Sequence, residues 1–140
     1  MKYALLLFTF ILCGQLIMAQ DKPAIKIDCV APVKLKTGQS VKLKVSVSHN
    51  LKKEKTGTLV LSLINHQTQT SVDGWFLNIF PLQYFTTIKN EKFEVEFPFT
   101  VPNDYSDSFD LVLVAKVENL KDSIGFVIST NKVIPFGKKL

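Results

Sequence analysis

The sequence predicts an all-β protein, an antiparallel β-sandwich of immunoglobulin-like type with about seven short strands. Three observations lead to this prediction. Apolar and polar residues alternate in several stretches, as they do in strands with one buried face. Polar turns separate those stretches. No stretch combines the apolar period and the caps of an amphipathic helix.

The first half of the chain contains three expected strands. Residues 24–36, "AIKIDCVAPVKLK", suit an edge strand interrupted by Pro32, because proline cannot donate to a strand ladder. Residues 41–47, "VKLKVSV", alternate between apolar positions and lysine or serine. Residues 58–64, "TLVLSLI", are apolar on both faces, which indicates a central strand covered on both sides.

The second half contains three more expected strands. Residues 93–97, "FEVEF", put phenylalanine and valine on one face and glutamate on the other. Residues 109–119, "FDLVLVAKVEN", form a long alternating strand, and "IGFVIS" at 124–129 is the last one expected. No linker is wide enough to divide the chain, so residues 20–140 are predicted to be one domain.

Two of these strands carry opposite charges on their outward faces. Lys42 and Lys44 face outward from the strand at 41–47, and Glu94 and Glu96 face outward from the strand at 93–97. The second and fifth strands pair in immunoglobulin-like order. We therefore expect residues 41–47 and 93–97 to be antiparallel neighbours, with opposite charges meeting across the pair.

The segment Ser71–Thr87, "SVDGWFLNIFPLQYFTT", concentrates aromatic residues and holds the only tryptophan. A tryptophan in the middle of such a chain is most often a core anchor between sheets, so Trp75 is expected to be buried. The remaining aromatics are too many for one side of one strand. The residues identified as motif and core candidates are Trp75, Phe76, Phe80, Tyr84 and Phe85.

The strands 58–64, 111–117 and 124–128 are expected to form the second sheet. Their core-facing residues would be Leu59, Leu61, Leu63, Leu111, Leu113, Ile124 and Phe126. The opposite parity is also apolar and forms a candidate partner surface made of Val60, Ile64, Val112, Val114 and Val127. We expect residues 76–85 to cover this face in part; the alternative is a face open to a partner.

The N-terminus has the plan of a secretory signal peptide, residues 1–19. Lys2 precedes an apolar run from Tyr3 to Met18, which is short for a membrane span, and cleavage is expected after Ala19. A membrane anchor is the alternative. Leu12 stands where a lipobox has a small residue, so lipid anchoring is not expected. The predicted location is outside the cell or in the periplasm.

The charge of the chain argues against nucleic-acid binding. The formal net charge is +5, and every basic residue is lysine. Specific recognition of bases and phosphates favours the planar guanidinium of arginine. Residues 20–60 hold nine lysines and three acidic residues, so this basic end is either a solvated face or a contact for an anionic surface.

The sequence shows no motif for catalysis, a metal or a cofactor. His49 and His66 lie beside asparagine in polar stretches and are expected to be solvated turn residues. Neither "HExxH", "GxSxG", "CxxC" nor a phosphate-binding glycine loop occurs. Cys29 is the only cysteine after the leader and is expected to be a small buried hydrophobic residue, with an intermolecular bridge or a reactive thiol as the alternatives. No enzymatic activity is predicted.

Three stretches resemble a β-sandwich domain of bacterial alpha-2-macroglobulin-like proteins. They are "VDGWFLNIFPLQYFT" (72–86), "FPFTVP" (97–102) and the preceding "G-x-x-V-K-L-x-V-x-V-x-N" (38–50, here followed loosely). The resemblance extends over about residues 33–134. It implies a macroglobulin-type domain that packs against other domains, in an endopeptidase-inhibitor family. The family's bait segment and "CGEQ" thioester are missing here, so covalent trapping of proteases is not implied.

Together these features predict an exported, non-catalytic protein-binding or accessory module. Its partner would be a protein, either a protease or an envelope component. Two alternatives stay open: an envelope protein that assembles with itself, and a carbohydrate-binding sandwich whose aromatic residues stack on sugars. The exposure of Trp75 separates them, because a buried ring excludes the sugar platform and a solvent-facing ring favours it.

Overall fold

The computed structural model describes residues 24–131. The predicted leader and the basic tail after Asn131 lie outside the described residues. Within 24–131, no helix is long and apolar enough to cross a membrane. The elements are β1 (Ile25–Cys29), β2 (Lys34–Lys36), β3 (Ser40–His49), β4 (Lys55–Asn65), the 3-10 helix η1 (Asp73–Trp75), β5 (Leu82–Thr87), β6 (Phe93–Thr100), β7 (Phe109–Val117) and β8 (Leu120–Asn131).

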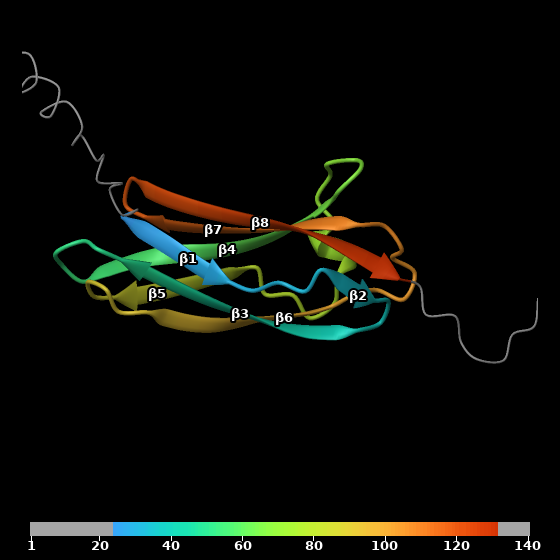
Figure 1. Ribbon diagram of the computed structural model, residues 1–140, viewed down its shortest axis with the longest axis horizontal. Helices are drawn as coiled ribbons and strands as arrows, with labels where there is room; N and C mark the ends of the chain where they lie inside the picture. The colour runs from blue at the N-terminus through green and yellow to red at the C-terminus, as the bar shows by residue number, and fades with distance from the viewer. Residues whose placement is uncertain (1–23, 132–140) are drawn as a thin grey trace, which may run out of the picture.

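The strands form two packed sheets, which confirms the predicted β-sandwich of immunoglobulin-like type. One sheet has the order β1-β3-β6, and the other has the order β2-β8-β7-β4-β5. This is the immunoglobulin arrangement of strands A, B and E facing strands G, F and C, with an added strand beside C. Figure 1 shows the strands running along the long axis of the molecule.

The chain changes sheets near its start. β1 pairs antiparallel with β3, whereas β2 pairs parallel with β8 in the other sheet. Pro32 lies between β1 and β2, so the predicted interruption of the edge strand is confirmed. The alternation pattern indicated neither β2 as a separate strand nor its parallel pairing, because a three-residue strand is too short to show a period.

The predicted pairing of β3 with β6 is confirmed. The two strands are antiparallel, and residues 40–47 of β3 pair with all of β6. Lys44 is opposite Glu96, as expected, whereas Lys42 is opposite Pro98 and Glu94 is opposite Ser46. The four charged residues predicted to face outward are all exposed. Cross-strand pairs of opposite charge contribute about 0.2–1 kcal/mol each, so this pattern favours the register more than it raises stability.

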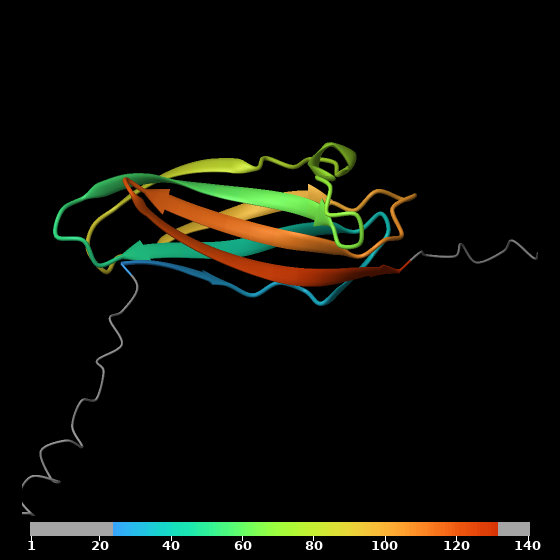
Figure 2. The same cartoon turned by 90° about the horizontal axis from the view of Figure 1, so that it is seen from above.

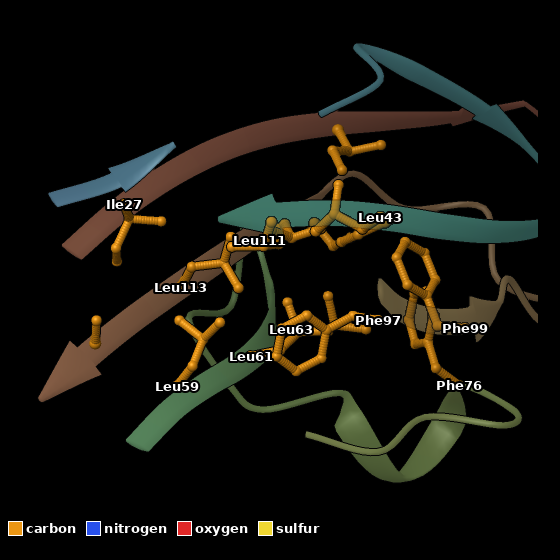
Figure 3. Close-up of a cluster of buried hydrophobic side chains, with 14 of the residues drawn as sticks. Ile27, Leu43, Leu59, Leu61, Leu63, Phe76, Phe97, Phe99, Leu111 and Leu113 are labelled. Atoms are coloured by element: carbon orange, nitrogen blue, oxygen red, sulfur yellow. The ribbon is translucent and has the colours of Figure 1, made fainter. Parts of the chain in front are cut away.

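The core lies between the sheets and is built mainly from β4 and β7. Leu59, Leu61, Leu63, Leu111 and Leu113 are fully buried, as their parity predicted. Ile124 and Phe126 on β8 face the same way but are only partly buried, because β2 flanks β8 only at its last residues. Figure 3 shows leucines from the two central strands meeting Leu43 and Phe97 of the opposite sheet.

Candidate interaction surface

The aromatic segment is divided between the inside and the outside of the domain. Phe76 and Phe85 are buried, with exposed fractions of 4% and 2%. Trp75, Phe80 and Tyr84 are exposed, at 62%, 65% and 69%. The prediction of a buried Trp75 is therefore wrong, and so is the assignment of Phe80 and Tyr84 to the core. The path of the backbone through this segment explains why these three aromatic side chains are exposed.

The stretch around η1 connects the two sheets and buries one ring. Val72 donates its backbone N–H to Leu63 O at 2.9 Å, and Asp73 Oδ1 accepts the N–H of Leu63 at 2.6 Å. Four residues later, Leu77 exchanges two backbone hydrogen bonds with Thr100 of β6, at 3.2 and 2.8 Å. The segment is thus fastened to β4 on one side and to β6 on the other, and Phe76 lies between these attachments.

Phe76 completes an aromatic cluster at this end of the sandwich. Its ring centroid lies 5.9 Å from that of Phe99, 5.3 Å from Tyr105 and 4.9 Å from Phe109, all with edge-to-face geometry. Aromatic pairs prefer this geometry. Figure 3 shows Phe76 pointing from its segment toward Phe99. Trp75, one residue earlier, belongs to the outer side of the same turn.

β5 places its side chains alternately on the two faces of the five-stranded sheet. Phe85 and Thr87 point into the core, and Leu82, Tyr84 and Thr86 point outward. Asn78 has a left-handed backbone, with φ of 57°, in the short stretch between the Leu77 attachment and β5. In Figure 2, η1 and β5 run along one margin of the molecule.

The candidate partner surface lies on the outer face of the five-stranded sheet. Val60 is directly opposite Leu82 of β5 and Val114 of β7. Val112 is opposite Gly125 of β8. Val127 is 53% exposed. The other four residues of this surface are half-buried: Val60, Ile64, Val112 and Val114.

The prediction that residues 76–85 partly cover that face is wrong. β5 joins the sheet in its own plane, beside β4, and Phe76 points into the core instead of over the face. Burial of the central valines comes from their neighbours within the sheet, which stand side by side on a pleated surface. The face is therefore continuous with the exposed residues Leu82 and Tyr84 at its margin.

The outer face of the three-stranded sheet has a different character. A shallow hollow of about 700 Å³ there is lined by residues of β1, β3 and β6, with lysine and glutamate side chains from adjacent strands. Lys44 stands opposite Glu96 in the ladder, so carboxylates accompany the lysines of the basic end. This interleaving favours the interpretation of a solvated face over a contact for an anionic surface.

A smaller hollow lies beside Trp75. It has a volume of about 210 Å³ and is lined by Trp75, Tyr105 and polar residues from the loops before η1 and before β7. Asn65 Nδ2 donates to Asp107 Oδ2 at 3.1 Å and to the Tyr105 hydroxyl at 3.5 Å. Burial raises the pKa of the Tyr105 hydroxyl. Drug-sized ligands generally occupy larger pockets, so this hollow fits only a small group.

The two histidines occupy different environments. His49 ends β3 and is buried, which corrects its predicted place in a solvated turn. Its Nδ1 accepts the N–H of Leu51 at 3.2 Å, so Nε2 carries the proton and donates to Thr87 O at 2.8 Å. His66 is exposed, with Nδ1 2.6 Å from Asp110 Oδ1. Residues 24–131 contain no group of three or more side chains that could hold a metal ion.

Cys29 is partly buried at the end of β1 and packs against the core. Burial raises the pKa of its thiol, so the thiolate, which is the reactive form, is scarce at neutral pH. This environment favours the predicted packing role over that of a reactive thiol.

No family model and no curated protein matches this chain. Solved structures share its fold. The CARDB domain of a Pyrococcus furiosus protein, solved in complex with di-metal ions, superposes with a TM-score of 0.58 at 9% identity over 79% of this chain and 90% of that one. The alkylpurine DNA glycosylase AlkC of Pseudomonas fluorescens, bound to DNA, gives 0.52 at 11% identity over 76% of this chain and 31% of the enzyme.

A family 123 glycoside hydrolase from Clostridium perfringens gives a TM-score of 0.50 at 11% identity, over 78% of this chain and 27% of the enzyme. The chain therefore corresponds to a whole CARDB domain and to about a third or less of the two enzymes. At these identities the similarity establishes an immunoglobulin-like β-sandwich fold.

Proposed function

We propose that this chain is a small exported, non-catalytic protein-binding module that resembles one macroglobulin-type domain. The observation that carries the proposal is a set of five exposed large apolar side chains within ten residues, which we call the aromatic edge: Trp75, Leu77, Phe80, Leu82 and Tyr84. Exposed apolar surface of this kind costs solubility unless something covers it, and contiguous patches mark interaction sites.

The family resemblance supports the same proposal. One of the three stretches that carry it, residues 72–86, contains the whole aromatic edge. In a large multidomain relative, a neighbouring domain would cover such a surface. In this chain a separate protein would do so, either a protease or an envelope component. Binding would be reversible, because the chain lacks the "CGEQ" thioester of that family.

A capture experiment tests this function. The full chain, immobilised, is expected to retain a defined protein from the envelope fraction of its native host. The triple variant Phe80→Ser, Leu82→Ser, Tyr84→Ser should reduce that retention at least tenfold, because it removes the exposed apolar contacts. Partners are identified by mass spectrometry.

The matched control changes the other sheet. Lys42→Ser with Lys44→Ser alters exposed side chains of β3 and should leave retention unchanged. Equal retention by the triple variant and the wild type would exclude the aromatic edge as the binding surface. Absence of any specific partner in the wild type would count against a protein-binding role.

A second candidate function is carbohydrate binding, and the exposure of Trp75 favours it. The ring is 62% exposed and lines the small hollow with Tyr105, Asp104 and Asp107. Aromatic rings with polar neighbours can stack on a sugar and hydrogen-bond to its hydroxyls.

Because Trp75 is the only tryptophan, its fluorescence reports directly on this site. Under the carbohydrate hypothesis, titration with envelope-derived oligosaccharides shifts the emission, and calorimetry detects heat that Trp75→Ala abolishes. Unchanged emission with every glycan tested would reject this candidate and leave the protein-binding proposal intact.

A further inference from the structure

The four sheet edges differ in their protection against pairing with another strand. Natural proteins protect an edge with charges, proline, short strands or local cover. β1 carries Lys26 and Asp28, paired at 2.8 Å, and the carboxylate of Asp122 accepts the backbone N–H of Ile27 at 3.0 Å. β2 has only three residues, two of which are lysine. Both edges are therefore protected.

The edge at β6 is protected in three ways. Glu94 and Glu96 are exposed along the strand, and Pro98 interrupts its backbone donors. Near its end, the backbone of Thr100 is already paired with Leu77. A strand that approached this edge would meet the glutamate charges, would lack a backbone donor at Pro98 and would find the backbone of Thr100 already hydrogen-bonded.

β5 carries none of these protections. Its sequence, Leu82–Thr87, contains no charged residue and no proline. The backbone N–H of Leu61 donates to Pro81 O at 2.8 Å. This bond shows which residue pairs of the β4-β5 ladder are hydrogen-bonded pairs. Because hydrogen-bonded and non-hydrogen-bonded pairs alternate in an antiparallel ladder, the backbone groups of Leu82, Tyr84 and Thr86 point away from β4. The described residues offer no strand on that side.

We propose that a second copy of this chain pairs its own β5 with this edge, antiparallel and across a two-fold axis at Tyr84. Tyr84 then faces Tyr84 of the second copy, and Leu82 faces Thr86 of the second copy. Each such pair exchanges both backbone hydrogen bonds, and the two five-stranded sheets become one. The inference goes beyond the proposed function: it uses part of the aromatic edge, but the occupant is a second copy of this chain and not a different protein.

Charge and symmetry favour a second copy as the occupant. A two-fold contact pairs the strand with an identical strand, so a strand that carries charges of one sign would repel its copy. β5 is uncharged, and residues 24–131 carry twelve lysines against eleven acidic residues, so two described domains repel each other little. The pairing also joins the outward side chains Leu82 and Tyr84 of both copies into one apolar strip.

Single cysteines test the register directly. In the proposed dimer, position 84 faces itself at a Cα separation of about 5.5 Å, which suits a disulfide. Position 86 lies four residues away from its equivalent, about 13 Å, which is too far for a disulfide. Under mild oxidation of the full chain purified after export, Tyr84→Cys should give a covalent dimer. Thr86→Cys and the wild type, which carries Cys29, should not.

A proline variant tests the backbone contribution. The N–H of Tyr84 points away from β4, so Tyr84→Pro leaves the β4-β5 ladder intact while it removes a donor to the second copy. Tyr84→Val also lacks the ring but keeps the donor. Sedimentation should show a dimer Kd for Tyr84→Pro at least tenfold weaker than for Tyr84→Val, with both variants giving the wild-type circular dichroism spectrum. If Tyr84→Pro fails to fold, the cysteine pair decides.

The outcomes separate this inference from the proposed function. If the wild type is a monomer at several hundred micromolar and Tyr84→Cys forms no cross-link, a second copy is not the occupant of the edge. This holds even if another protein is captured. Cross-links at both positions 84 and 86 overturn the two-fold register. A specific dimer with no captured partner supports this inference and refutes the proposal of a foreign protein partner.

Discussion

Phe76→Ala is expected to lower the free energy of unfolding by about 3–5 kcal/mol. The change removes a buried ring that contacts Phe99, Tyr105 and Phe109 edge to face and leaves a cavity at the end of the sandwich. The same segment holds the two sheets together at this end, so the neighbouring side chains have little freedom to close the cavity. Urea unfolding followed by circular dichroism measures the loss.

The adjacent residue is the matched control. Trp75→Ala removes a larger side chain, but one that is 62% exposed, and should change stability by less than about 1 kcal/mol. A loss for Trp75→Ala equal to that for Phe76→Ala would show that the tryptophan, and not the phenylalanine, is the packed ring. The pair therefore tests which of two neighbouring aromatics enters the core.

Gly57→Ala is expected to destabilise the domain by about 1–3 kcal/mol. Gly57 lies in β4, where an added Cβ would stand 2.5 Å from Lys116 O, 2.6 Å from Phe85 Cζ and 2.6 Å from Val117 Cγ2. The first contact is a backbone atom of β7, so that strand would have to shift, and the side chains of Phe85 and Val117 would have to repack. A thermal melt of the variant measures the effect.

Gly125→Ala is the control for this change. Gly125 also lies within a strand, but its added Cβ would meet only ordinary contacts, at 3.9 and 4.0 Å. Loss of chain entropy in the unfolded state should make this variant neutral or slightly more stable. If the two variants melt at the same temperature, close packing around Gly57 does not limit stability.

Local alternation was sufficient to predict much of the fold. It assigned the core-facing leucines of β4 and β7 and the outward lysines and glutamates of β3 and β6, and the antiparallel pairing of those two strands is confirmed. The residues of the outer apolar face were also chosen by parity. The period of two is a property of the extended backbone itself, so it can be read from the sequence before any tertiary contact is known.

The candidate surface was predicted less well. The sequence placed Trp75, Phe80 and Tyr84 in the core and His49 in a solvated turn, and the structure reverses all four assignments. The segment Ser71–Thr87 has no single period because it contains three kinds of structure in succession. They are the isolated β-bridge of Ser71 with Ile64, the 3-10 helix η1 and the strand β5. The stretch "LQYFTT" does not resolve the question either, because one parity holds Leu82 and Tyr84 and the other holds Gln83 and Phe85, and the more apolar parity is the exposed one.

The sequence by itself determined which side chains along each strand share a face, because neighbouring residues of an extended chain point in opposite directions. Only the tertiary structure decided which of Trp75 and Phe76 is buried, because that depends on where the chain crosses from β4 to β6. It also decided that β5 is an unprotected edge. Edge exposure depends on strand order, which arises from contacts between residues far apart in the sequence.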